Sequence, residues 1–382
     1  MRPINDIRKA PIVDFLSSLK LPYDVISLGQ GIPFFRPPSE AVEKVVQNAG
    51  NDTGYRYSED AGFLSARKVI SEKLVRENNI NTDPSKNIIV TSGANQAFLN
   101  ALIAISDVGD EIIFFTPTYF NYIMATEMVG RTPVLVPTDA MYQPDIFLLK
   151  KAVTKRTRAV VTISPNNPTG AVYSYSLLKQ INDLCASSSL YHISDEVYEY
   201  YTFDGAVHVS PAQFDRKLTH TVSLFSCSKA FALSGYRVGF MVIPDLLYDN
   251  VLKVQDTIGI CAPSLSQLAS QVSWSIGGSY VHRFYDELNQ MRQYCIHKLS
   301  GMHSVNLIKT KGAYYFFVKL DTPLSSYDVA VRLAEEFGVI VLPGELFDAS
   351  FPSLRISYGN CPFEDLKKAL DRLQNGLDKI IS

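Results

Sequence analysis

The sequence predicts an α/β protein with a large, doubly wound and mostly parallel sheet and a smaller α+β region at the carboxyl end. Three observations carry this prediction. Short apolar runs without polar alternation predict strands that are buried on both faces. Amphipathic stretches between these runs are long enough for crossover helices. After residue 280 the alternation ends, and two long helical patterns enclose a few strand patterns.

Seven apolar runs of four to six residues, rich in Val, Ile and Phe, form the predicted large sheet. They lie at 87–90, 111–115, 133–136, 159–163, 190–193, 221–225 and 238–243. Crossover helices are predicted at 96–105 and 176–186. These elements place a large domain at 46–280.

The region that follows begins with a charged helical pattern at 281–299. Strand patterns come next, and a last helix closes the chain; they lie at 312–320, 339–344, 353–359 and 362–381. This order predicts a small α+β domain at 281–382. The first residues carry few strong signals, and we expect the segment 1–45 to associate with the small domain.

The composition argues against several classes of protein. The chain has 382 residues, 46% hydrophobic and 19% charged, so it can bury a large core. Because the net charge is −2 and no basic run occurs, we expect no nucleic-acid partner. Because no long apolar stretch occurs, we expect no membrane partner.

The cysteines and histidines favour neither disulfides nor metal. The five cysteines are an odd number without a C-x-x-C pair, which is typical of reduced thiols. The six histidines lack the spacing of zinc ligands, so we predict no metal site. No signal peptide is recognisable, and we expect the protein to be cytoplasmic.

Ligands of a doubly wound sheet bind at the carboxyl ends of its strands, so motifs that follow strands carry the most weight. TSGANQAFLN (91–100) follows the first strand and opens a helix. Free amides beside Gly93 could bind an anion there. The alternative is an ordinary turn between strand and helix.

Two further motifs follow neighbouring strands. In SPNNPTG (164–170), two prolines predict a rigid turn that holds the amide of Asn167 in the crevice; the alternative is a merely tight turn. In SDEVYEYYTFDG (194–205), Asp195 ends a buried strand, where a charge needs a cation or strong donors. Tyr198 is expected on the same side. The alternative is that the two acidic residues cap the next helix.

The fourth motif is SCSKAFALSGYRVGF (226–240), which also follows a strand. Lys229 is a candidate for a Schiff base, because a partly desolvated amine has a lowered pKa and becomes nucleophilic. Ser226, Ser228 and Arg237 could converge on a phosphate, which prefers a planar partner with several donors.

Together these segments resemble the fold-type I, class I and II aminotransferases, which use pyridoxal 5′-phosphate (PLP). The similarity runs in order from LGQGIP (28–33) to LRISYG (354–359), and N-P-T-G with S-x-S-K-x7-R-x-G is its most specific part. It implies an aspartate aminotransferase-like fold with a large PLP-binding domain. It also implies transfer of an amino group from an L-α-amino acid to a 2-oxo acid.

The resemblance implies a role for each candidate residue at the ring of the cofactor. Lys229 is expected to hold PLP as a Schiff base and to move a proton, while Asp195 keeps the pyridine nitrogen protonated. Asn167 and Tyr198 are expected to hydrogen-bond the ring oxygen O3′. Tyr119, in TPTYFNY, is expected to stack on the ring.

The resemblance also implies how the phosphate and the substrate are bound. The expected phosphate cup consists of Gly93, Ala94, Asn95, Ser226, Arg237 and, in support, Ser228. Tyr57, in YRYSEDAG, matches a tyrosine contributed by the neighbouring subunit, which implies a homodimer with shared active sites; otherwise it is an exposed loop aromatic. Arg355 is expected to clamp the substrate α-carboxylate beside Gly31 and Asn167; otherwise it is a surface arginine.

The substrate is less well defined than the reaction. Asn95 stands where some aspartate aminotransferases place a lysine, so the resemblance implies an aromatic, broad-range or aspartate-like substrate. A PLP-dependent C–S lyase or synthase of the same fold remains the alternative, because it shares the cofactor residues. A ligand-sensing regulator would need a basic DNA-binding region, which we do not expect in this sequence. An NAD-linked dehydrogenase would need a third glycine after Gly29-Gln-Gly31, and the sequence does not have it.

Overall fold

A seven-stranded sheet forms the centre of the computed structural model, which describes residue 7 and residues 11–381. The strand order is β2-β8-β7-β6-β5-β3-β4. The strands are β2 (Ile88–Thr91), β3 (Glu111–Thr116), β4 (Thr132–Pro137), β5 (Thr157–Ile163), β6 (Tyr191–Asp195), β7 (Thr221–Ser226) and β8 (Gly239–Val242). β8 alone runs opposite to the other six strands, so the predicted doubly wound, mostly parallel sheet is confirmed.

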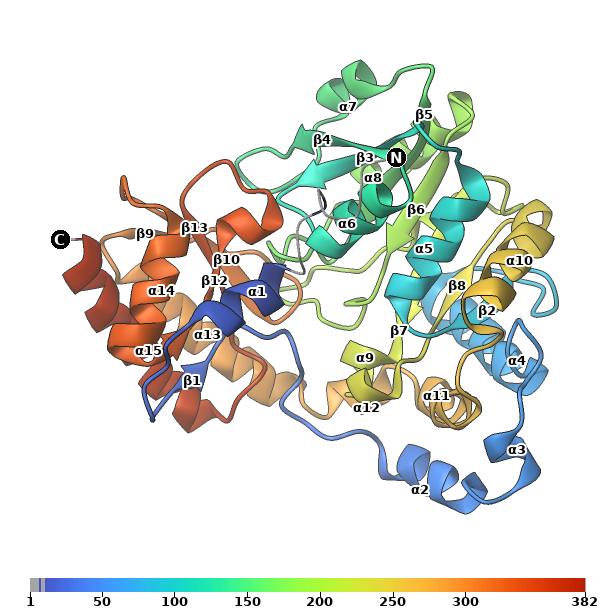
Figure 1. Ribbon diagram of the computed structural model, residues 1–382, viewed down its shortest axis with the longest axis horizontal. Helices are drawn as coiled ribbons and strands as arrows, with labels where there is room; N and C mark the ends of the chain where they lie inside the picture. The colour runs from blue at the N-terminus through green and yellow to red at the C-terminus, as the bar shows by residue number, and fades with distance from the viewer. Residues whose placement is uncertain (1–6, 8–10, 382) are drawn as a thin grey trace.

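Helices cover both faces of this sheet (Figure 1). They are α4 (Leu64–Lys73), α5 (Ala94–Ile105), α6 (Phe120–Met128), α7 (Ile146–Ala152), α8 (Tyr175–Ser187), α9 (Cys227–Ala230), α10 (Tyr248–Gly259) and α11 (Ser264–Ile276). In β3, Ile112 packs in a cluster with α5 and α10, whereas Ile113 packs in a cluster with α7 and α8. The predicted crossover helices at 96–105 and 176–186 are α5 and α8.

Short helical turns connect several of these elements. They are the π-helical turn η2 (Leu74–Asn78) and the 3-10 turns η3 (Pro211–Gln213), η4 (Ser234–Tyr236), η5 (Asp245–Leu247) and η6 (Gly344–Phe347).

The prediction of two buried faces is wrong for the strand at 133–136. This strand is β4, which lies at the edge of the sheet beside β3. Val136 is its one buried residue. An edge strand has a neighbour on one side only, and a short apolar run does not distinguish it from a central strand.

The carboxyl-terminal region forms a separate antiparallel sheet in the order β12-β13-β10-β9. Its strands are β9 (Val305–Asn306), β10 (Tyr315–Leu320), β12 (Leu342–Pro343) and β13 (Ser353–Ser357), and its helices are α13 (Tyr285–Ser300), α14 (Ser326–Phe337) and α15 (Phe363–Ile381). Figure 1 shows this sheet and its helices, in orange and red, at the side of the large sheet. The expected α+β character of the region is therefore observed.

The single helix expected at 281–299 is interrupted. The short helix α12 (Ser279–His282) ends before Phe284, and α13 begins after it. The ring of Phe284 stacks on that of Phe35 with centroids 4.2 Å apart. This contact with a segment distant in sequence explains why the helical periodicity did not predict the break.

The amino-terminal segment packs against elements that lie beside each of the two sheets. α1 (Pro11–Ser18) and β1 (Ile26–Ser27) lie by the smaller sheet, and β1 pairs with β11 (Val339–Ile340). α2 (Ser39–Asn48) packs on α11 beside the larger sheet, and α3 (Asp52–Tyr55) follows (Figure 1). Residues 1–6 and 8–10 of the segment 1–45 lie outside the described residues. The division at 45 and 280 stays an interpretation, because both positions fall inside helices.

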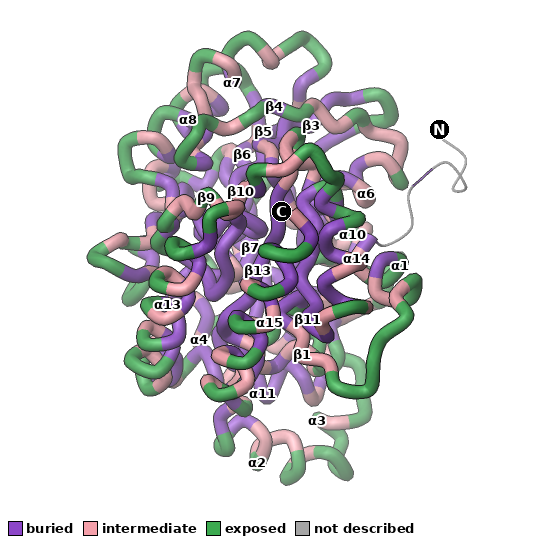
Figure 2. Tube along the Cα trace, turned by 90° about the vertical axis from the view of Figure 1, so that its left-hand side faces the viewer, coloured by how far each residue is buried: buried purple, intermediate pink, exposed green. Residues whose placement is uncertain are grey.

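The buried residues lie mainly in and around the two sheets. Figure 2 shows the strands as a mostly purple interior, with exposed residues on the outer helices. In the described part of the chain, no helix combines the length and the apolar character needed to cross a bilayer.

Candidate active site

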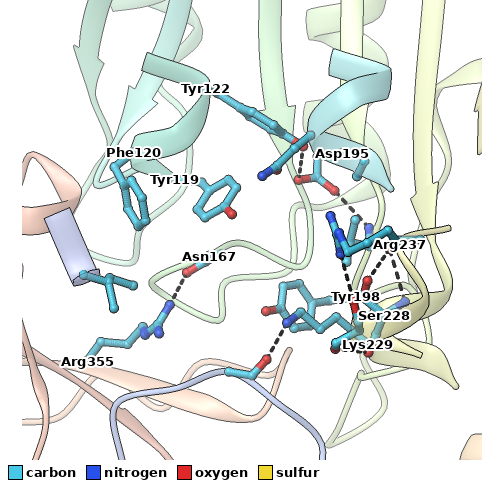
Figure 3. Close-up of a pocket in the computed structure, with 17 residues that line it drawn as sticks. Tyr119, Phe120, Tyr122, Asn167, Asp195, Tyr198, Ser228, Lys229, Arg237 and Arg355 are labelled. Atoms are coloured by element: carbon cyan, nitrogen blue, oxygen red, sulfur yellow. Dashed lines mark hydrogen bonds between the residues drawn. The ribbon is translucent and has the colours of Figure 1, made fainter. Parts of the chain in front are cut away.

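The residues after β5, β6 and β7 meet helices α1, α5 and α6 and strand β13 around one cavity of about 220 Å³ (Figure 3). It is lined by Ile12, Gly31, Ala94, Asn95, Tyr119, Phe120, Tyr122, Asn167, Asp195, Val197, Tyr198, Ser226, Ser228, Lys229, Ser234, Arg237 and Arg355. The cavity lies at the carboxyl ends of the parallel strands, where such sheets bind ligands.

Lys229 lies in the short helix that follows β7. Its Nζ donates a hydrogen bond of 2.5 Å to the carbonyl oxygen of Gly31. Burial, followed by the charges of Arg355 and Arg237, lowers the pKa of Lys229 to about 8, whereas Asp195 acts in the opposite direction. An amine with this pKa is partly neutral near physiological pH and can act as a nucleophile.

Asp195 is the last residue of β6 and is buried. Its Oδ2 accepts a hydrogen bond of 2.8 Å from the Tyr122 hydroxyl, and its Oδ1 accepts one of 3.0 Å from the Val197 amide. Burial nevertheless raises the pKa of Asp195 to about 6. A buried carboxylate with two donors and no salt bridge within the described residues can still take a cationic partner.

Two further acidic side chains of the same segment are engaged elsewhere. Glu196 accepts hydrogen bonds from Ser210 and His208, and Glu199 pairs with the buried Lys73 at 2.6 Å. The described chain forms turns and no helix directly after Asp195, so the alternative that Asp195 and Glu196 cap a helix is wrong. Asp195 alone of these carboxylates lines the cavity.

One corner of the cavity is built to receive an anion. Gly93 precedes α5 with φ of 82°, and a Cβ placed on it would lie 2.8 Å from Nη2 of Arg237. The first amides of α5, at Ala94, have no helical acceptor. Ser226 donates to Ser228 with an Oγ–Oγ distance of 3.0 Å. Amides, hydroxyls and a guanidinium in one corner form a donor set suited to a phosphate.

Arg355 lies on the opposite side of the cavity (Figure 3). It is 3% exposed, so the alternative of a surface arginine is wrong. Its Nη1 donates to Oδ1 of Asn167 at 2.8 Å and its Nη2 to the carbonyl of Gly29 at 2.7 Å, but its buried Nε has no partner. No carboxylate of the described residues pairs with it, so it is suited to bind the carboxylate of a ligand.

Aromatic rings form the walls between these groups. Arg355 lies over the rings of Phe347 and Tyr315, at 4.9 and 5.1 Å from their centroids. Burial raises the pKa of Tyr198 to about 12 and also raises that of Tyr119. Both phenols are therefore neutral at physiological pH and available as hydrogen-bond donors.

Nearly all predicted site residues meet at this cavity. Gly93 does not line the cavity, but it lies directly beside Arg237, which does. Tyr57 does not line it; its side chain is 77% exposed after α3. The expected contribution of Tyr57 to a neighbouring subunit therefore stays a prediction.

Five lining residues were not predicted from the sequence: Ile12, Phe120, Tyr122, Val197 and Ser234. Tyr122 had a usable signal, because it follows Tyr119 by three residues, which is about one helical turn. Ile12 had none, since its segment carries no motif and reaches the cavity through tertiary packing.

Comparisons with known proteins agree with this arrangement. A family model described as aminotransferase class I and II matches residues 23–373. The chain is 34% identical to an aspartate aminotransferase of Pyrococcus abyssi, over 98% of this chain and 95% of the relative. It is 32% identical to aromatic-amino-acid aminotransferase 2 of Thermococcus litoralis, over 92% of both chains.

Solved structures give the same result. The crystal structure of an aromatic aminotransferase from Pyrococcus horikoshii superposes with a TM-score of 0.89 and 34% identity, covering 96% of this chain and 99% of the other. An aspartate aminotransferase from Thermus thermophilus with maleate superposes with a TM-score of 0.90 and 28% identity, covering 99% and 100%.

Proposed function

The chain belongs to the class I and II aminotransferase family, and on this basis we propose that its cavity takes the amino group from L-amino acids with apolar or aromatic side chains and passes it to a 2-oxo acid. The protein is a PLP-dependent aminotransferase. One observation supports the residue roles below. A single cavity holds three incompletely paired charged side chains, Lys229, Asp195 and Arg355.

The residues present fit PLP at three points. A partly neutral amine is available for the aldehyde, a buried carboxylate for the ring nitrogen, and a donor-rich corner for the phosphate. When bound, PLP supplies an electron sink that makes the substrate Cα–H acidic.

We assign to Lys229 the covalent attachment of the cofactor and the movement of the substrate proton through its Nζ. The lowered pKa supports both roles, because the same nitrogen must lose a proton to attack and accept one later. The carbonyl of Gly31, 2.5 Å away, orients this nitrogen.

We assign to Asp195 the stabilisation of the protonated ring nitrogen. Tyr122 and the Val197 amide hold the carboxylate oxygens in place. A cation beside Asp195 would offset the effect of burial and keep the carboxylate ionised. Tyr122 is thus a positioning residue, since it acts through the carboxylate.

Asn167 and Tyr198 are assigned to the ring oxygen O3′, and Tyr119 to the face of the ring. All three line the cavity, and Figure 3 shows the Tyr119 ring between Asp195 and Arg355. The neutral Tyr198 phenol can donate a hydrogen bond to an oxygen anion.

The phosphate is assigned to the corner around Gly93 and Arg237. The set consists of Gly93, Ala94, Asn95, Ser226, Ser228 and Arg237. We further propose a homodimer in which Tyr57 of each subunit completes the corner of the other. The exposure of Tyr57, away from the cavity of its own chain, supports this.

Arg355 is assigned to the substrate α-carboxylate, with Gly31 and Asn167 beside it. The unpaired Nε supports this role, because a carboxylate can accept from two guanidinium nitrogens at once.

The preference for apolar side chains rests on the rest of the lining. The described lining residues include three cations, Lys229, Arg237 and Arg355, and each already has a role. None is left for a second substrate carboxylate. Phe120, on the Arg355 side in Figure 3, packs against Phe347 with centroids 6.2 Å apart and offers an apolar surface instead.

A cytoplasmic location is proposed from the thiols. All five cysteines lie within the described residues and are free, as expected in a reducing compartment.

Mixing the holoenzyme with single amino acids tests the proposal. We expect phenylalanine and tyrosine to change the cofactor absorbance at least tenfold faster than aspartate, with release of the matching 2-oxo acids. Replacing Arg355 by Leu should raise the KM for every amino acid about 100-fold, or about 3 kcal/mol, since all share the α-carboxylate. Faster reaction with aspartate would contradict the substrate class, and release of ammonia in place of exchange would contradict transamination.

A further inference from the structure

A second and larger cavity lies outside the catalytic one. Its volume is about 520 Å³, and it shares no lining residue with the first. Its lining includes Met141, Tyr173, Tyr175, Val207, Lys309 and Lys311. This volume is within the range of about 300–1,000 Å³ that is typical of small-molecule sites.

The walls come from segments far apart in the sequence that are fixed to one another. Gly312 donates a backbone hydrogen bond of 2.8 Å to Gly170. The Thr310 hydroxyl donates one of 2.8 Å to the carbonyl of Thr169. The segment leading into β10 is thus bound to the loop that leads into α8, and the cavity between them is preformed.

The lining of this cavity includes large apolar side chains that are exposed to solvent. Met141, Tyr175 and Val207 are 58%, 55% and 73% exposed, and all three line it. Beneath them lie the buried side chains of Tyr173 and Val209. A cluster of large exposed apolar side chains around a concave apolar surface is a mark of a binding site.

The charged residues of the lining are all positive. Its two charged members are Lys309 and Lys311, both exposed, and it contains no acidic residue. Lys311 contacts the backbone carbonyl of Asp204 at 3.5 Å, while the carboxylate of Asp204 pairs with Arg292 at 2.8 Å. The two ammonium groups therefore lack carboxylate partners within the described residues.

We propose that this cavity binds a small amphipathic organic anion, with an aromatic or branched apolar body and one carboxylate or sulfonate. The apolar wall receives the body, and the two lysines receive the anionic group. A free amino acid fits less well, because its ammonium group meets no acidic partner in the lining. The site goes beyond the proposed function and does not depend on the choice of amino donor.

The second cavity adjoins the first through one loop. Asn167 lines the catalytic cavity, and Ala171 lines the second one. Within this loop, the amide of Asn166 donates to the carbonyl of Ala171 at 2.8 Å. A ligand in the second cavity therefore contacts the loop that holds Asn167 against Arg355.

Titration of the holoenzyme with 1-anilinonaphthalene-8-sulfonate, followed by its fluorescence, tests the site. We expect saturable binding that is weakened at least tenfold by Lys309→Glu with Lys311→Glu, and also by Val207→Asp. The matched controls are Lys150→Glu with Lys155→Glu, and Val108→Asp, which change exposed residues elsewhere. Both controls should leave binding unchanged, and none of these variants should alter transamination without the probe.

Two comparisons make the result decisive. N-phenyl-1-naphthylamine, which has the same rings without the sulfonate, should bind at least tenfold more weakly, and Phe120→Ala in the catalytic cavity should leave sulfonate binding unchanged. The proposal is overturned if the sulfonate does not saturate, if the lysine variants bind it like their controls, if the neutral probe binds equally well, or if only Phe120→Ala weakens binding.

Discussion

At the scale of single residues, the catalytic cavity is lined by buried ionisable side chains that have too few hydrogen-bond or ion-pair partners within the chain. The raised pKa of Asp195 and the lowered pKa of Lys229 share one leading cause, the burial of a charged group. Arg355 keeps a buried Nε without an acceptor. Side chains in this state are typical of sites where a ligand supplies what is missing.

The rate at which the apoenzyme captures PLP should depend on pH through Lys229. Only the neutral amine attacks an aldehyde, so the rate should rise with pH and level off above about 8, the pKa of Lys229. Stopped-flow absorbance between pH 6 and 11 measures the midpoint, and a free amine measured in parallel corrects for ionisation of PLP. A midpoint near 10.5, the ordinary lysine value, would contradict the assignment.

Replacing Asp195 by Asn should lower turnover without preventing PLP from binding. The amide keeps the shape of the side chain but cannot stabilise a protonated ring nitrogen, so we expect kcat to fall about 1,000-fold, or about 4 kcal/mol, with PLP still bound. Tyr122→Phe, which removes one donor to Asp195, should lower kcat about tenfold. Steady-state kinetics with PLP content measured on the same samples checks this. An unchanged kcat in Asp195→Asn would exclude the role.

Asn167 and Lys229 were predictable because each lies in a short motif after a strand. Their positions follow from the strand that precedes them, because parallel strands end at one edge. Ile12 could not be predicted in this way. It reaches the cavity through packing of a helix whose own sequence has no chemical signal.

At the scale of elements, a single carbon atom added at Gly93, just before α5, should disturb the proposed phosphate site. Gly93→Ala should raise the Kd of PLP at least tenfold, because the new Cβ would lie 2.8 Å from Arg237. Gly109→Ala is the matched control: its φ of 90° is also positive, but its Cβ would meet no atom within 4 Å. Both changes carry a similar backbone cost of about 1 kcal/mol.

Equilibrium titration of the two apo variants with PLP, together with their unfolding temperatures, separates these effects. Both variants should lose similar stability, and only Gly93→Ala should lose affinity. Equal PLP affinity in the two variants would mean that Arg237 does not share a phosphate site with Gly93.

Elements were predictable where their residues are buried by local neighbours, as in β5 and α8. Prediction was wrong where a distant segment decides the outcome. Phe284 lies at the break in the expected helix, where its ring stacks on Phe35, and β4 is half-exposed because no strand follows it at the sheet edge. Neither fact is encoded in the residues of the element itself.

At the scale of the whole molecule, the proposed homodimer makes a prediction about Tyr57. Tyr57→Phe removes one hydroxyl donor and should raise the Kd of PLP about tenfold, or about 1.4 kcal/mol. Tyr55→Phe is the control, because this neighbouring hydroxyl is bonded to Asp52 at 2.5 Å within its own helix. Sedimentation at the concentrations of the titration checks the assembly. A monomer with full PLP affinity would contradict the shared site.

The overall architecture was predictable from the switch between strand–helix alternation and the later α+β pattern. The path of the first residues was not. β1 pairs with β11 in a two-stranded sheet of their own beside the smaller sheet, while α2 packs on α11, so one weakly patterned segment contacts both parts. Such a segment takes its structure from surfaces formed elsewhere, and its composition gives little sign of them.

The central claim is that the cofactor is attached to Lys229, and borohydride reduction of the holoenzyme tests it most directly. Reduction followed by proteolysis and peptide mass spectrometry should find one pyridoxyl group, on the peptide that contains Lys229, and none in Lys229→Ala treated in the same way. A pyridoxyl group on another lysine, or no adduct in the wild-type protein, would contradict the account.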